Sequence, residues 1–235
     1  MIYLSIDDVF EIWCDLKNKE NKYKSIFQNK TLAFLKKINT KLGTKITLFC
    51  FYEGNGIDLT QISNKWKKQF ILNSKWLKFG FHGRNDKVNY NTASYSRLIR
   101  DYQLFEREII RFAGKECVSK DLKLHFFSGN YIDIINLMKT NNLDKLICAD
   151  DNRISYGLPK RKLKLINKNY ELNEDGIKYC KSLKRYEDTN IVFSRIQHLI
   201  YQNILNDCYC YTHEKQLKYS KIRKRIVKWE KKTKY

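Results

Sequence analysis

The sequence has no run of about 18 consecutive apolar residues, the length that a membrane-spanning helix needs. It also has no internal repeat, no linker and no low-complexity segment. At 235 residues with 43% hydrophobic residues, it suits one globular core, so we expect a single catalytic-size domain over residues 1–235. The first apolar run begins at Ile2, which leaves no room for a signal peptide, and we expect a cytoplasmic protein.

The seven cysteines are odd in number and have no paired spacing, so a disulfide framework is not expected. Free thiols suit a reducing compartment. Cys208 and Cys210 would lie on one face of a strand. We interpret them as small buried residues, with metal binding as the alternative.

Acidic residues are scarce, with 25 Asp and Glu against 46 Lys and Arg, for a net charge of +21. Such an excess invites a nucleic-acid partner. The lysines, however, are spread along the whole chain, and a Lys-rich usage with one proline (Pro159) is what an AT-rich genome imposes. We therefore do not expect a nucleic-acid partner. The basic C-terminal helix expected at about 214–232 is interpreted as a solvated face, with a polyanion contact as the alternative.

Short β-type runs alternate with longer helical runs, the pattern of βα units around a parallel sheet. The nearly continuous apolar runs predict strands that are buried on both faces. The expected strands cover residues 2–6, 45–52, 76–81, 122–127, 145–149, 190–193 and 208–212. The expected helices cover residues 31–42, 94–113, 130–140 and 214–232, and residues 160–188 are left unassigned. The fold class predicted is α/β, a distorted (β/α)7-type barrel with a largely parallel sheet.

Carboxylates and imidazoles follow the expected strands at the point where each one ends. Strand ends of a parallel barrel share one mouth, where such barrels hold their sites. Taken singly, an aspartate there can cap a helix and a histidine can be a hydrogen-bonded structural residue. Taken together, they predict a divalent metal site with one carboxylate free to act on water. The residues are Asp7, Asp8, His82, Asp86, His125, Asp150, Asp151 and His213.

Five segments resemble, in order, the polysaccharide deacetylase (NodB-homology) superfamily, also called carbohydrate esterase family 4, and its small, poorly characterised bacterial branch. They are residues 4–10 (LSIDDVF), 73–82 (NSKWLKFGFH), 124–129 (LHFFSG), 149–158 (ADDNRISYGL) and 211–214 (YTHE). The resemblance implies a NodB-like catalytic domain.

The resemblance implies that Asp7 is the catalytic base and that Asp8 and His82 are metal ligands. The family's H-x-x-x-H motif reads His82 to Asp86 here, so that Asp86 stands in the place of the second imidazole ligand. Zinc is the expected ion, with Mn, Fe or Mg as alternatives that an added oxygen ligand would favour.

The family's R-x-P-Y motif is replaced by residues 123–126 (KLHF). Lys123 stands for the arginine and would keep Asp7 ionised. His125 takes the proline position, has no family role, and is a candidate for binding or orienting the substrate. By the resemblance His213 is the general acid.

Asp150 or Asp151 lies where the family keeps an acidic residue that orients the general acid or the substrate, and Arg153 is a further orienting candidate. His198 falls in a helical stretch outside the motifs and is interpreted as structural.

The implied reaction is metal-assisted hydrolysis of an N-acetyl group on a sugar or polysaccharide precursor, so that the expected partner is a carbohydrate substrate. Two alternatives stay open. One is a degenerate NodB-like protein that binds glycan without turnover, because Asp86 replaces a histidine and the third motif is altered. The other is a different metallohydrolase on the same fold, acting on a phosphoester or a small amide.

Overall fold

The computed structural model describes residues 2–151, 153–188 and 208–232. The strand expected at 190–193 and His198 lie outside this part. Seven parallel strands form a curled sheet in the order β5-β2-β1-β10-β9-β7-β6, and β8 pairs antiparallel with β9. The strands are β1 Ile2–Val9, β2 Lys45–Phe51, β5 Leu77–Gly83, β6 Asp121–Leu122, β7 Lys145–Cys148, β8 Glu171–Glu174, β9 Ile177–Arg185 and β10 Cys208–His213, besides the short hairpin β3 Glu53–Gly54 and β4 Ile57–Asp58.

The two ends of this sheet nearly meet. Phe79 of β5 forms a parallel bridge with Val118, just before β6, and the Ser119 N–H donates to the Phe79 carbonyl at 2.8 Å. The sheet is thus a nearly closed parallel barrel, and the predicted distorted (β/α)7 fold is confirmed. Its C-terminal strand ends share one mouth, where a barrel of this kind places its site.

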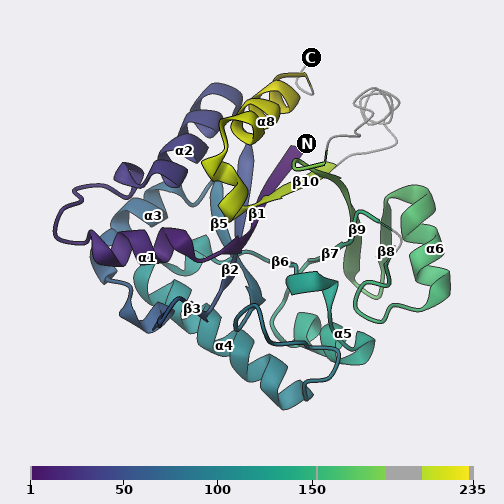
Figure 1. Cartoon of the computed structure of the whole chain (residues 1–235). Coiled ribbons are helices and arrows are strands. Elements are labelled where there is room, and N and C mark those ends of the chain that lie inside the picture. The colour runs from purple at the N-terminus through teal and green to yellow at the C-terminus, as the bar shows by residue number, and fades with distance from the viewer. Residues whose placement is uncertain (1, 152, 189–207, 233–235) are drawn as a thin grey trace.

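Helices surround the sheet on its outer side (Figure 1). They are α1 Glu11–Asn18, α2 Lys30–Leu42, α3 Lys67–Asn73, α4 Tyr95–Phe112, α5 Tyr131–Thr140, α6 Lys160–Asn169 and α8 Ser220–Lys232. None of the helices in the described ranges is long and apolar enough to cross a membrane.

Helix α4 matches its expected range of 94–113 closely because local chemistry defines both ends. The Ser94 side chain accepts a hydrogen bond from the Arg97 N–H, as an N-cap residue does. Gly114 follows the helix with φ 104°, a conformation that glycine adopts without strain. Between these ends, buried residues such as Leu98, Tyr102 and Phe105 recur at helical spacing and face the barrel.

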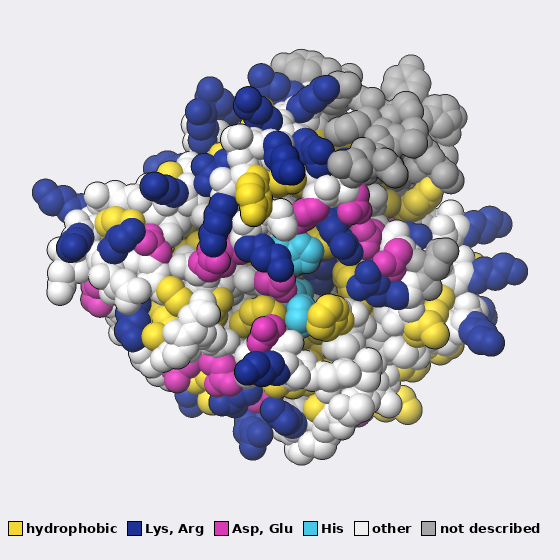
Figure 2. Space-filling view, viewed as in Figure 1, with side chains coloured by type: hydrophobic (Ala, Val, Ile, Leu, Met, Phe, Trp, Pro, Cys, Tyr) yellow, Lys and Arg dark blue, Asp and Glu magenta, His cyan; other side chains and the backbone are white. Residues whose placement is uncertain are grey.

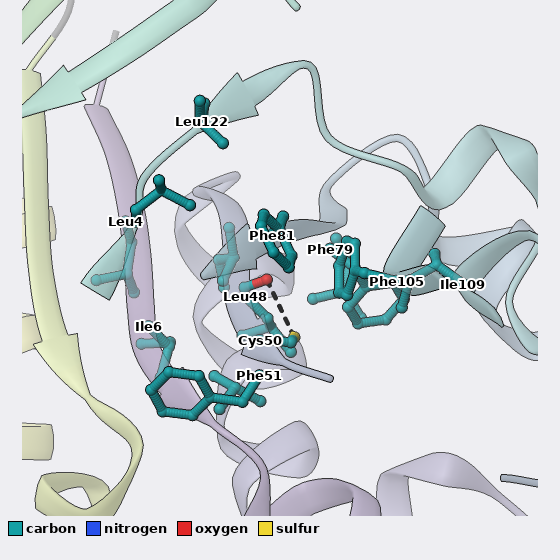
Figure 3. Close-up of a cluster of buried hydrophobic side chains, with 14 of the residues drawn as sticks. Leu4, Ile6, Leu48, Cys50, Phe51, Phe79, Phe81, Phe105, Ile109 and Leu122 are labelled. Carbon is teal, nitrogen blue, oxygen red and sulfur yellow. Dashed lines mark hydrogen bonds between the residues drawn. The ribbon is translucent and has the colours of Figure 1, made fainter. Parts of the chain in front are cut away.

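The main core lies between the sheet and the helices that cover it. Figure 3 shows Phe79 and Phe81 of β5 packed among strand side chains and against Phe105 of α4. Removing each such ring from water stabilises the fold by about 1.5–3 kcal/mol. Cys50 is part of this layer and donates from Sγ to the Leu48 carbonyl at 3.2 Å. The cysteines that the structure describes are free, as expected.

Three expectations about local structure were wrong or incomplete. The strand expected at 122–127 is wrong, because β6 ends at Leu122 and residues 125–127 form a 3₁₀ turn. The unassigned stretch 160–188 contains helix α6 and the hairpin of β8 and β9. The terminal helix expected from residue 214 starts later, because residues 214–218 form a separate 3₁₀ turn and α8 begins at Ser220.

Candidate functional site

A backbone irregularity at the end of β1 presents two adjacent carboxylates to the barrel mouth. The pairing of β1 with β2 shifts register between Ile6 and Val9, and Asp8 has φ 55°. Successive residues of a regular strand point to opposite faces, which would separate Asp7 from Asp8. The shift and the left-handed backbone at Asp8 let each carboxylate reach its own partners at the same mouth.

Asp7 is buried in a small polar network. Lys123, directly after β6, places Nζ 2.6 Å from Asp7 Oδ2, and both side chains are almost wholly buried. The Ser5 hydroxyl donates to Asp7 Oδ1 at 3.1 Å. Burial lowers the pKa of Lys123 although the Asp7 carboxylate opposes that shift. The Lys123 ammonium group gives the buried Asp7 carboxylate a partner of opposite charge. A buried charge without such a partner would be costly.

Asp8 lies among three imidazoles. Its Oδ1 is 3.2 Å from His82 Nε2 and 3.6 Å from His125 Nε2, and its Oδ2 is 4.0 Å from His213 Nε2. Burial alone would raise the pKa of Asp8, but His82 and the charges of the other two imidazoles outweigh it and lower the pKa to about 2. Asp8 is therefore an anion throughout the physiological range.

The hydrogen bond of His82 determines which of its ring nitrogens faces Asp8. His82 Nδ1 lies 2.6 Å from the Lys123 carbonyl, which can only accept, so that Nδ1 carries the proton. In the neutral ring Nε2 then presents a lone pair to Asp8 Oδ1, an oxygen that is buried and has no hydrogen-bond partner within the described residues. Two facing acceptors are repulsive unless a cation lies between them or the ring is protonated.

The donor chemistry of Asp8 and His82 fits a divalent ion. An imidazole whose far nitrogen binds a backbone carbonyl is the usual form of a histidine ligand. Ligand atoms about 2 Å from a tetrahedral zinc lie about 3.3 Å apart, close to the 3.2 Å between Asp8 Oδ1 and His82 Nε2. As the side chains stand, however, the described chain has no group of three or more His, Cys, Asp or Glu residues that could hold a metal. Asp8 and His82 are thus two candidate ligands, without a third side chain arranged beside them in the described residues.

Asp86 is exposed on the loop after β5. Its charge acts on His125, whose pKa is lowered by burial and by His82 in spite of the Asp8 and Asp86 charges.

His213, at the end of β10, is held by a carboxylate that the sequence did not reveal. Glu187 Oε1 lies 2.9 Å from His213 Nδ1, and it also accepts from the His213 N–H at 2.8 Å and from the Thr212 hydroxyl at 2.9 Å. Burial would lower the pKa of His213, but Glu187, Asp7 and Asp8 outweigh it and raise the pKa. His213 Nε2 is left facing the site in a ring that is easily protonated.

Asp150, Asp151 and Arg153 follow β7. Asp150 Oδ1 accepts from the Tyr211 hydroxyl at 2.9 Å. Asp151 and Arg153 form a partly exposed ion pair with an N–O distance of 2.5 Å, and the Arg153 guanidinium lies 5.6 Å from the Phe127 ring. The carboxylate that contacts His213 is therefore Glu187, while Asp151 and Arg153 contribute to the exposed rim.

The turn after Lys123 forms another part of the rim. Phe126 is 69% exposed and its ring centroid lies 3.9 Å from that of His125. Phe126 and Phe127 both have left-handed backbones, with φ 56° and 55°. Such strain is uncommon in bulky residues and clusters at functional sites. Figure 2 shows histidine side chains near the centre of this face, with acidic and basic side chains around them.

Neither known protein families nor curated proteins match the sequence. Solved structures do match. The wild-type form of a CE4 family pseudoenzyme from Bacillus anthracis aligns at TM-score 0.51 and 12% identity, over 100% of this chain and 60% of that chain. A mutant of that pseudoenzyme with restored enzymatic activity aligns at TM-score 0.51 and 13% identity, over 100% of this chain and 62% of that one.

This chain thus spans less than two thirds of the length of both matching chains. The likeness concerns the fold alone, since the sequences are so different. The resemblance to the polysaccharide deacetylases carried by the sequence segments is confirmed at that level, and the chain has the fold of carbohydrate esterase family 4.

Proposed function

We propose that this protein is a metal-dependent hydrolase that removes an N-acetyl group from a sugar or a polysaccharide precursor. One observation carries the proposal. At the mouth of a barrel with the carbohydrate esterase fold, Asp7 is paired with Lys123, and the adjacent Asp8 lies 3.2 Å from His82 Nε2. One carboxylate is thus positioned for proton transfer and the other for binding a cation.

Asp8 and His82 would hold the divalent ion, zinc or else Mn, Fe or Mg, which when bound would polarise the amide carbonyl and lower the pKa of a water molecule. Asp7 would accept a proton from that water molecule, and the ion pair with Lys123 would hold its carboxylate in place. A backbone N–H near Phe126 donates to the oxyanion of the tetrahedral intermediate.

On the other side of the site, His213 protonates the leaving amine. Glu187 binds Nδ1 of the ring, which leaves Nε2 directed at the site, 4.0 Å from Asp8 Oδ2. Glu187, Asp7 and Asp8 raise the pKa of His213 and so favour the protonated ring that a general acid requires. The exposed Phe126 ring offers an apolar face on which a sugar can stack.

The test is acetate release from a panel of N-acetylated sugars, both oligomeric and nucleotide-linked, with Zn²⁺, Mn²⁺, Fe²⁺ or Mg²⁺ added. The expected result is release that needs the ion, stops with a chelator and is lost in His213→Ala. Absence of release from the whole panel by a metal-loaded protein would contradict the proposal.

A second candidate is a glycan-binding protein without turnover. Two observations favour it: one structure of the same fold is described as a pseudoenzyme, and no three metal-binding side chains are yet arranged around an ion in the described chain. Binding of the same sugars by calorimetry, without acetate release, would support this candidate. Phosphoester hydrolysis by the metal-loaded protein would instead favour another metallohydrolase.

A further inference from the structure

Asp8 and His82 are two candidate ligands of a cation, and a third ligand would have to come from another side chain at the mouth of the barrel. Asp86 occupies the motif position of an imidazole, yet it is exposed on its loop. A ligand that remains in water must give up its hydration to bind an ion, so an exposed Asp86 is poorly prepared for that role.

His125 is placed differently. Its Nε2 lies 3.6 Å from Asp8 Oδ1, the same oxygen that faces His82 Nε2 at 3.2 Å. The centroids of the two imidazole rings are 5.5 Å apart. Asp8 Oδ1 is buried and has no hydrogen-bond partner within the described residues. Nε2 of His82 and Nε2 of His125 therefore converge on Asp8 Oδ1, and a cation at that place would give this oxygen a partner.

The backbone that carries His125 is specifically built. Two consecutive phenylalanines follow it in left-handed conformation, each at a cost of roughly 1–3 kcal/mol. The Phe127 carbonyl accepts from the Tyr156 N–H at 2.7 Å, and the Ser128 hydroxyl donates to the His125 carbonyl at 2.9 Å. The Phe51 ring packs edge-on against the imidazole, with centroids 5.2 Å apart. These contacts hold the turn, and with it His125, against the mouth of the barrel.

We propose that His125 is the third protein ligand of the divalent cation bound by Asp8 and His82, in place of Asp86. The proposal rests on the metal site of the proposed function. A modest rotation of the His125 ring completes the group of three, at a cost of about 0.5–1.5 kcal/mol if it leaves the preferred rotamer. The ligands are then the imidazoles of His82 and His125 and the carboxylate of Asp8, a set that suits zinc. They come from the ends of three strands, whereas a set with Asp86 would come from two.

The experiment measures zinc affinity by calorimetry, with no turnover involved, in the wild type, His125→Ala, His125→Asn and the matched control Asp86→Ala. A second readout follows the imidazole ¹⁵N resonances of the wild type as Zn²⁺ is added. Circular dichroism and thermal unfolding confirm that each variant is folded, and His125→Asn preserves polarity and much of the volume should the alanine variant unfold.

The expected result is a loss of at least about 100-fold in zinc affinity for both His125 variants, because even partners outside the ligand shell are worth 10–100-fold. Asp86→Ala should lose at most about fivefold, the effect of an exposed charge. A nitrogen of His125 should shift on zinc addition together with Nε2 of His82. Wild-type affinity in a folded His125 variant, or a larger loss in Asp86→Ala, would overturn the proposal.

These outcomes separate the ligand assignment from the proposed function. A wild type that binds zinc through His125 but releases no acetate refutes the hydrolase alone. A His125 variant that keeps both zinc and acetate release refutes the ligand assignment alone.

Discussion

Asp7 and Asp8 are neighbours in the chain but bind different partners: Asp7 Oδ2 lies 2.6 Å from Lys123 Nζ, and Asp8 Oδ1 lies 3.2 Å from His82 Nε2. The register shift at the end of β1 makes this division possible. The two carboxylates can therefore have separate roles, one in proton transfer and one in cation binding.

Asp7→Asn should keep the metal and lose turnover, because the change removes a base and not a ligand. General acid–base loss typically costs about 10²–10⁴-fold in rate. Metal content by elemental analysis and acetate release are measured side by side, with Asp8→Asn as the control that should lose the metal. If Asp7→Asn loses the metal and Asp8→Asn keeps it, the two roles are the wrong way round.

Glu187→Gln should lower the pKa of His213, because the Glu187 carboxylate at 2.9 Å is a main cause of its elevation. Activity that needs a protonated His213 is lost as pH rises through this pKa, so that limb of the pH profile should move to lower pH in the variant. An NMR titration of the His213 ring measures the pKa without any turnover. An unchanged pKa would show that Glu187 only positions the ring.

The same shift affects stability. The pKa of His213 in the folded protein lies above its ordinary value of 6.5. The ion pair with Glu187 therefore stabilises the fold fully at pH values below 6.5. This stabilisation is lost as the pH rises through the pKa of the folded state. Glu187→Gln should reduce this pH dependence of the free energy of unfolding.

Lys123→Met should destabilise the protein, because Asp7 would stay buried without its cation. Breaking a buried pair from one side typically costs about 3–5 kcal/mol. Urea unfolding at neutral pH measures the free energy, and Lys123→Arg, which keeps a charge, is the control. A Lys123→Met variant as stable as the wild type would mean that Asp7 gains a proton or water in its place.

Glu214→Ala should also destabilise the protein, by about 2–4 kcal/mol, through the loss of a cap. The N-cap of α1, Phe10, has no capping side chain. Instead the buried Glu214 accepts from the N–H groups of Phe10, Glu11 and Ile12 at 2.6–2.7 Å. Glu214→Gln, which keeps one acceptor oxygen, should cost less. Equal unfolding midpoints for the alanine variant and the wild type would exclude this capping role.

The parallel barrel was predictable because its central strands are continuous apolar runs. Leu4 and Ile6 of β1 and Leu48 of β2 are fully buried, as the runs indicated. β9 was not predictable on that basis, since lysines such as Lys178 and Lys181 interrupt it and one of its edges pairs with the polar strand β8. Lysines between the buried positions of such a strand conceal its apolar alternation.

Part of the site was predictable because several of its residues lie at the ends of these apolar runs. Asp7, Asp8, His82 and His213 follow recognisable strands, and the structure brings them together. Glu187 follows the unrecognised β9, and it meets His213 only because β9 pairs with β10. Had β9 been assigned, a carboxylate at its end would have been a candidate by the strand-end rule.

The turn of His125 was missed for a different reason. Aromatic runs such as Phe126 and Phe127 favour extended structure, and their left-handed backbones are maintained by long-range contacts such as the Tyr156 N–H on the Phe127 carbonyl. The sequence could place His125 near the site but not next to Asp8.

The central claim is that a divalent cation binds between Asp8 and His82, and anomalous scattering from a crystal grown with Zn²⁺ tests it most directly. We predict one strong peak at the zinc absorption edge, in contact with Asp8 Oδ1 and His82 Nε2. A zinc-saturated crystal with no peak at this carboxylate, and Asp8 paired with a protonated His82 instead, would contradict the account.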